Sequence, residues 1–310
     1  MKRYKRTNIL LALIAALALL LVSACGPIGG SGGSSLTVEQ VLQNSLNAMK
    51  QLKTVHFDVK MTGNVQSNTA AATPTTGTPR PSSVTVNLAA SGDEALPNQQ
   101  SLHLTVGQSV TGQSANLAEI ILQDKVYIQN TKGQWYVIDR SKLTGIANPF
   151  SGINIDQNTL LGLLQHSKIT DHGDEMLNGQ SLRHISAVLD KEGLKQLLES
   201  NAQLKQLFGQ QNIDTVIDNA KTFQSSVDVW IDETKFYVHR TEMKLNLSAD
   251  LTSLKNSVTP TATVTAAIPS SVTTSLDSIV DLSKFNEPVT IIAPANAIPT
   301  DNPITIFTGQ

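Results

Sequence analysis

Cysteine is almost absent from this 310-residue sequence, and Cys25 is its single example. One cysteine excludes an intramolecular disulfide, so an exported fold must be held together by its core. Aromatic residues are also scarce, at 4% of the chain, whereas Val, Ile, Leu and Thr are abundant. This composition favours a sheet-rich architecture with an aliphatic interior.

A strong charge of either sign is missing as well. The formal net charge is −2, and beyond the first few residues Lys and Arg form no basic patch or stripe. Nucleic-acid-binding domains carry such a patch, so we expect no nucleic-acid partner.

Motifs that carry catalysis are missing too. The sequence has no Gly-x-Ser-x-Gly elbow, no phosphate-binding Gly-x-x-x-x-Gly-Lys-Ser/Thr loop, no Gly-x-Gly-x-x-Gly and no His-Glu-x-x-His. His56 and Asp58 share one face of an expected strand without a partnered nucleophile, which indicates a solvent-facing polar row. We expect no catalytic residues and no enzymatic activity.

A metal site is not expected either. His166 and His172 lie near three carboxylates in the sequence, Asp171, Asp174 and Glu175. Their spacing fits no common zinc pattern, and the segment is typical of a surface turn that enters a strand.

The N-terminus is basic, with Lys and Arg but no acid in residues 1–24, and an apolar run follows at Ile9–Val22. Fourteen residues give about 21 Å of helix, short of the roughly 30 Å hydrocarbon core, so a signal peptide fits better than a membrane span. Residues 22–26, Val-Ser-Ala-Cys-Gly, resemble the bacterial lipobox, in which the cysteine receives a diacylglyceryl group. An ordinary signal peptide or a short anchor with an incidental cysteine is the alternative. We expect lipidation at Cys25, with this covalent lipid in place of any cofactor.

Residues 25–35 comprise this cysteine and a Gly/Ser tether with a reach of roughly 15–20 Å. A capping-box pattern at Thr37 and Gln40 then begins an amphipathic helix of about 15 residues. A strand with alternating apolar residues follows directly from Val55.

Further along, strand and helix signals alternate in blocks. Hairpins are expected at 126–138, at 168–189 around Asn178-Gly179, and at 224–251. Helical signals lie within 140–166 and 190–208, and a last strand passes through Ile279 and Leu282. Thr/Pro-rich inserts at 66–83 and 257–275 and an irregular tail at 294–310 complete the chain. The pattern predicts an α+β fold with an antiparallel sheet covered by helices.

The order of these segments resembles the LppX/LprG-type lipoproteins and, more distantly, the LolA-like fold. The resemblance spans one domain, residues 36–293, and is carried by residues 46–57, 126–135, 227–232 with 238–240, and 285–291. It implies a strongly curved antiparallel half-barrel with helices on its concave face and an apolar cavity between the two layers. Such a cavity holds the acyl chains of lipids or glycolipids, and the family has no catalytic residues.

Eight residues are candidates for the lining of that cavity. They are Phe57, Val59, Met61, Leu104, Trp135, Val229, Met243 and Leu245. Periodicity alone leaves open whether these rows touch packed helices or a bound acyl chain. Trp135 and Trp230 suit either ordinary packing or the rim of a cavity, because Trp has an apolar body and one N–H donor.

The leading hypothesis is therefore an exported, membrane-anchored lipoprotein on the extracytoplasmic face of the cell membrane, which binds a lipid or glycolipid and carries or presents it in the envelope. The second hypothesis is a scaffold or lipoprotein-binding module with a solid core and an envelope protein as partner. Hydrolysis of an envelope component ranks third.

Overall fold

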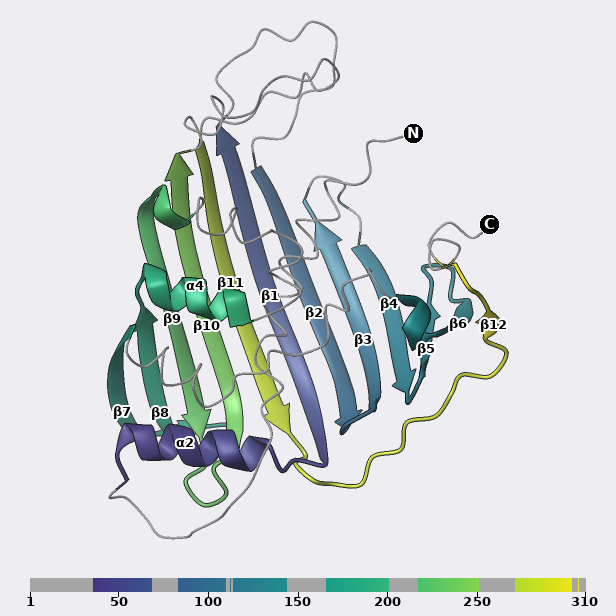
Figure 1. The fold of residues 1–310 in the computed structure, drawn as a ribbon, viewed down its shortest axis with the longest axis horizontal. Helices are drawn as coiled ribbons and strands as arrows, with labels where there is room; N and C mark the ends of the chain where they lie inside the picture. The colour runs from purple at the N-terminus through teal and green to yellow at the C-terminus, as the bar shows by residue number, and fades with distance from the viewer. Residues whose placement is uncertain are drawn as a thin grey trace, which may run out of the picture.

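The computed structural model describes residues 36–68, 83–109, 112, 114–143, 166–200, 217–250, 271–302 and 306. They form one open sheet of twelve strands in the order β12-β6-β5-β4-β3-β2-β1-β11-β10-β9-β8-β7 (Figure 1). The strands are β1 (Thr54–Asn68), β2 (Ser83–Ala95), β3 (Gln99–Gln108), β4 (Ser114–Leu122), β5 (Lys125–Gln129), β6 (Trp135–Asp139), β7 (Ser167–Leu177), β8 (Gln180–Leu189), β9 (Ala220–Ile231), β10 (Val238–Asp250), β11 (Ser271–Ser283) and β12 (Ile298–Pro299). The expected signal peptide, Cys25 and the tether lie outside the described residues.

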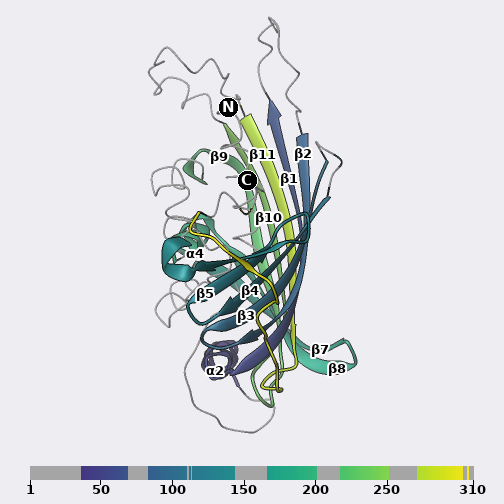
Figure 2. The same ribbon diagram turned by 90° about the vertical axis from the view of Figure 1, so that its right-hand side faces the viewer.

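The sheet is curved, and its two faces differ in chemistry. In β1 the odd-numbered residues from Val55 to Met61 are buried, whereas His56, Asp58, Lys60 and Thr62 alternate with them. Figure 2 shows helices on one side of the curved sheet, which is its concave face. The apolar residues of β1 cluster with Met49 and Leu52 at the end of one of these helices, so the apolar face is the concave one.

Two α-helices lie against this face, α2 (Val38–Met49) and α4 (Lys191–Ser200). The capping box expected at Thr37 and Gln40 is confirmed, since each backbone N–H bonds the other residue's side chain. Val41 of α2 is fully buried against Ile185 and Ile231 of the sheet. Burial of an aliphatic side chain of this kind contributes about 1.5–3 kcal/mol to stability. The apolar side of α2 is therefore what holds this helix on the sheet.

Helix α4 covers a second part of the concave face. Its Leu194 is buried against Ile217 and packs with Phe223 of β9 and Leu245 of β10. A 3-10 turn, η1 (Arg140–Leu143), follows β6. The rest of the helical segments expected at 140–166 and 190–208, namely 144–165 and 201–208, lies outside the described residues.

The hairpin predictions are confirmed. Asn178 and Gly179 join β7 to β8 with φ values of 50° and 83°, as a type I′ turn requires at its two central residues. Gly133 adopts φ 81° in the turn between β5 and β6.

The α+β expectation is confirmed only in part, because the described residues are mostly β. The strands run further than their apolar alternation indicated. β1 continues to Asn68 and β11 begins at Ser271, so both enter segments expected as inserts, and there they pair with each other. In the expected irregular tail, Ile298 and Pro299 pair in parallel with β6.

Gly92 of β2 lies beneath an aromatic ring on the concave face. It pairs with Phe57 of β1 and with Leu102 of β3. A Cβ at this position would lie 2.0 Å from the Ser101 carbonyl oxygen and 2.7 Å from Phe57 Cζ. The ring therefore occupies the space that any side chain at Gly92 would need.

We expect Gly92→Ala to lower the free energy of unfolding by about 3 kcal/mol, at the upper end of the cost of overpacking, because the clash involves backbone. Urea unfolding measures the difference. Gly107→Ala in β3 is the matched control, since a Cβ there meets no atom within 4 Å. Equal stability of the two variants would contradict this packing.

Candidate functional site

The concave face is a largely apolar surface across the middle of the sheet. Opposed residues in neighbouring strands share this face, so the register joins Val59 to Ala90 on one side and to Val280 on the other. Its buried members form one cluster: Met49, Leu52, Val55, Phe57, Val59, Met61, Val86, Leu88, Ala90, Leu102, Val106, Leu189, Met243, Leu276, Val280 and Leu282.

The structure brings most of the expected lining residues together on this face. Four of them, Phe57, Val59, Met61 and Met243, belong to the buried cluster, with exposed fractions of 1–3%. Leu104 and Leu245 are partly buried and pack against the same cluster. Val229 packs instead with the group around Val41 under helix α2.

The structure places Trp135 on the face opposite to the predicted cavity lining. It pairs with Gln129, which belongs to the row that continues through Ala118 and His103 to Ser91 and Asp58. That row lies on the convex face, one residue out of phase with Phe57. The expectation for Trp135 came from its aromatic character alone, and the register of the β5–β6 hairpin reverses it.

Two carboxyl groups interrupt the apolar concave face. Glu94 of β2 pairs with Val55, and Glu119 of β4 pairs with Leu102, so both side chains are in phase with the apolar row. Burial raises the pKa of Glu94 to about 7. Burial likewise raises the pKa of Glu119 to about 7, against a smaller lowering by Arg140, and its Oε1 atom is buried without a hydrogen-bond partner. At pH 7 each group is therefore about half protonated, which lowers the average charge on this apolar surface.

The convex face is polar and paired across strands. Arg240 of β10 donates to both carboxylate oxygens of Asp281 on β11, at 2.6 and 3.0 Å. His56 Nδ1 lies 2.7 Å from Asp93 Oδ1, and its Nε2 lies 3.4 Å from Asp58 Oδ2. His56 and Asp58 therefore belong to a row of polar side chains on the convex face, as the sequence predicted.

An open pocket of about 780 Å³ lies at the α2 end of the sheet, between the β7–β8 turn, the β9–β10 turn and the end of β11. Charged residues such as Asp281 and Lys284 line it together with the stacked rings of Tyr237 and Phe285, whose centroids are 4.7 Å apart. Burial lowers the pKa of His239, another lining residue. This mixed lining suits a polar group, whereas acyl chains match the concave face.

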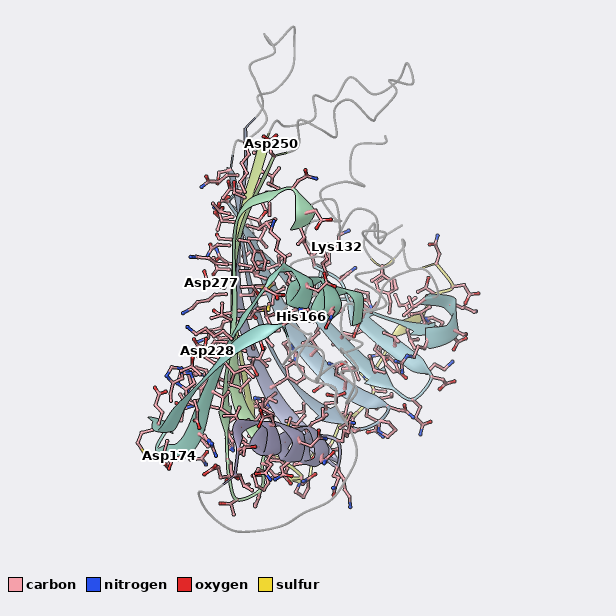
Figure 3. The ribbon with its side chains drawn as sticks, turned by 60° about the vertical axis from the view of Figure 1, so that its left-hand side comes forward. Lys132, His166, Asp174, Asp228, Asp250 and Asp277 are labelled. Atoms are coloured by element: carbon pink, nitrogen blue, oxygen red, sulfur yellow. The ribbon has the colours of Figure 1, made fainter. Side chains whose placement is uncertain are left out.

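The five residues weighed for a metal separate into different settings. His166 lies 3.3 Å from Asp190 of the loop before α4, and Asp171 accepts from Arg183. Figure 3 shows His166 on the side of the helices and Asp174 on the β7–β8 hairpin. His166, Asp171 and Asp174 are thus close in the sequence but have different partners or positions in the fold.

His172 and Glu175 instead meet residues of β8 and β9 on the convex face. The rings of His172, His184 and Trp230 stack in series, with 4.3 Å between neighbouring centroids. The second tryptophan, Trp230, therefore packs against histidines in place of forming a cavity rim.

Within the described residues, none of the helices has the length and apolar character needed to cross a membrane.

Taken together, the fold and the site define a protein with an open, curved antiparallel sheet and an apolar concave face. A family model described as a family of unknown function, DUF6612, matches residues 37–298, and the chain belongs to this family. No curated protein sequence matches the chain.

Several solved structures are similar to it. The lipoprotein LppX of Mycobacterium tuberculosis is 17% identical, with 81% of this chain and 96% of that chain covered and a TM-score of 0.39. LprF of Mycobacterium bovis is 14% identical, with 83% and 97% covered and a TM-score of 0.43. A putative outer membrane lipoprotein-sorting protein domain of Vibrio parahaemolyticus is 10% identical, with 76% and 87% covered and a TM-score of 0.23. LppX, the lipoprotein type that the order of segments resembles, is thus among the solved structures to which the chain is similar.

Proposed function

We propose that this protein is an exported lipoprotein that binds the acyl chains of a lipid or glycolipid on its concave face and carries or presents that lipid in the cell envelope. The observation that carries the proposal is the apolar cluster on the central strands of the concave face, which includes the row from Leu102 through Phe57 to Leu282 across β3, β2, β1 and β11. An apolar surface of this extent is what acyl chains require.

The N-terminal sequence supports the location. A lipid on Cys25 anchors the protein on the extracytoplasmic face of the membrane, and the tether at 26–35 keeps the sheet within roughly 20 Å of the bilayer. The apolar face is thereby held beside the membrane from which an acyl chain is taken. The proposal involves no covalent chemistry on the ligand.

A scaffold with a solid core is the second candidate, and one observation favours it. Phe57 and Val59 are only 1% exposed, as in a fully packed interior. Lipid binding requires an elongated space for an acyl chain beside the residues at the margin of the cluster, whereas a solid core leaves no such space. Leu104 lies at that margin, since it packs against the cluster and is partly exposed.

Native mass spectrometry of the full chain, extracted from its own membrane, tests the proposal. We expect a bound lipid in the wild type and less of it in Leu104→Trp, because the larger side chain occupies ligand space. The melting temperature should change little. Thr105→Trp is the matched control, since Thr105 is exposed on the convex face, and it should retain the lipid.

A solid core predicts a different pair of results. No lipid is then found in any variant, and Leu104→Trp is destabilised by about 1–3 kcal/mol through overpacking. That outcome would replace lipid binding with the scaffold function.

A further inference from the structure

A cluster of polar and aromatic side chains spans three strands at one edge of the convex face. The register places Trp230 of β9 opposite His184 of β8, and Asp228 opposite Ser186. A β-bulge in β7 between Asp171 and Gly173 leaves His172 outside the regular pairing. Figure 3 shows Asp228 pointing away from the helices, on the outer side of the sheet.

Two carboxylates flank the central histidine, one beside each ring nitrogen. His184 Nδ1 lies 2.8 Å from Glu175 Oε2, and His184 Nε2 lies 3.0 Å from Asp228 Oδ1. Trp230 donates its indole N–H to the same Glu175 oxygen at 3.1 Å. The ring of His184 is thus held between Trp230 and His172, and Glu175 is held from two directions.

A neutral imidazole has one N–H, so it cannot donate to both carboxylates at once. When Nδ1 donates to Glu175, the lone pair of Nε2 faces Asp228. A metal-bound histidine commonly has this arrangement, with a carboxylate on the nitrogen that does not bind the ion. His184 Nε2 and Asp228 Oδ1 lie 3.0 Å apart, close to the separation of about 3.4 Å between two ligands of one tetrahedral zinc ion.

His172 supplies a third donor. Its Nε2 lies 2.8 Å from Ser186 Oγ, on the residue opposite Asp228. One ligand atom each from His172, His184 and Asp228 lies within 4.8 Å of the others. Zinc bonds to nitrogen and oxygen are about 2.0–2.2 Å long, so shifts of about 1 Å bring all three onto one ion. His172 is exposed at the sheet edge, so its ring can make that adjustment by exchanging its contact with Ser186 for the ion.

We propose that His172, His184 and Asp228 form a binding site for a divalent transition-metal ion of the Zn²⁺ class, with Glu175 as the positioning residue for His184. Two imidazoles and one carboxylate are the donor types that zinc and its neighbours prefer. The site faces solvent, which leaves its fourth position to water. It is separate from the concave face, so it stands whether or not that face binds lipid.

The test uses the full chain in detergent, purified without a polyhistidine tag and titrated with ZnCl₂ by calorimetry. Co²⁺ serves as an absorbing substitute, whose visible bands report tetrahedral coordination. We expect one ion per chain with a dissociation constant below about 10 μM. His172→Ala and Asp228→Asn should each weaken binding at least tenfold, because each removes one ligand.

Two further variants separate a metal site from a purely structural ring stack. Glu175→Gln should weaken Zn²⁺ binding by about 10- to 100-fold, as removal of an outer carboxylate does. His103→Ala, an exposed histidine on the same face in β3, is the control and should bind as the wild type does.

Circular dichroism checks that each variant is folded; His172 is exposed and Asp228 is partly exposed, so we expect both variants to fold. Zinc binding weaker than about 100 μM in the wild type would overturn the proposal. Binding that is unchanged in His172→Ala or in Asp228→Asn would overturn it as well, since the ion would then be held elsewhere.

Discussion

Cys25→Ser is expected to move the protein from the membrane fraction to the soluble fraction. Two acyl chains at about 0.8 kcal/mol per buried CH₂ hold an anchored protein by nominally more than about 20 kcal/mol, so the anchored form does not dissociate on cellular timescales. Serine cannot form the thioether that attaches the diacylglyceryl group. Fractionation of cells followed by immunoblotting measures the distribution, and loss of the lipid mass from the N-terminal peptide identifies its cause.

Ser34→Ala provides the control for this experiment, because Ser34 lies in the tether and carries no lipid in the proposal. That variant should remain in the membrane. A Cys25→Ser protein found wholly in the membrane fraction would show that another segment anchors the chain.

Stability is expected to fall as pH rises from about 4.5 to about 7, because Glu94 and Glu119 are buried in the concave face. Their pKa values are about 7 in the folded protein and 4.5 for an ordinary glutamate. Between these values the folded state keeps protons that the unfolded chain releases, so the free energy of unfolding decreases with pH. At 1.36 kcal/mol per pKa unit, the difference between 4.5 and about 7 makes each carboxyl account for about 3 kcal/mol, and the loss is nearly complete by about pH 8.

Urea unfolding at pH 5 and pH 8 measures this dependence. Glu119→Gln should reduce the difference between the two pH values by about half, because an amide does not ionise. At pH 8 the variant should be about 2 kcal/mol more stable than the wild type. Glu39→Gln is the matched control, since Glu39 is exposed in the first turn of α2, and its pH dependence should parallel that of the wild type. Equal slopes for wild type and Glu119→Gln would contradict the burial of this carboxyl group.

Local elements were predictable from the sequence because their signals are local. The capping box at Thr37 and Gln40 marked the start of α2, and Asn178-Gly179 specified the turn between β7 and β8. Alternation in β1 showed which of its residues face inward. Each of these patterns acts within a few residues of the chain and depends little on what packs against it.

The two buried carboxyls had a weaker signal. Glu119 alternates with Leu117 and Ile121, and Glu94 continues the phase of Leu88 and Ala90, so strict period-2 counting places both inward. Charged side chains are rarely buried, so neither glutamate was a candidate for the concave face. Their position on that face follows from the register of strands β2 and β4 with their neighbours.

The histidine cluster was not predictable, because its members meet through pairing between strands. His172 and Glu175 are close to His166 in the sequence, yet their partners His184 and Asp228 come from β8 and β9. The bulge at His172 shifts the register by one residue; Gly173, with φ 73°, is a sequence signal for a bulge, but it does not indicate which strands lie opposite. The prediction for Trp135 failed for a related reason. The pairing register of a strand, and not the residue type, decides whether a side chain lies on the concave or the convex face.

The pairing of β1 with β11 has a consequence for how the chain matures. His56 pairs with Ser283 and Asn68 with Ser271, so the two central strands are joined across more than two hundred residues. Such distant contacts are late and slow to form, because closing a long loop costs entropy before any pairing repays it. Synthesis from the N-terminus completes β1 among the first elements of the sheet and β11 near the last. Throughout that interval one edge of β1 lacks the strand that pairs with it in the folded protein, and an unpaired strand edge promotes aggregation.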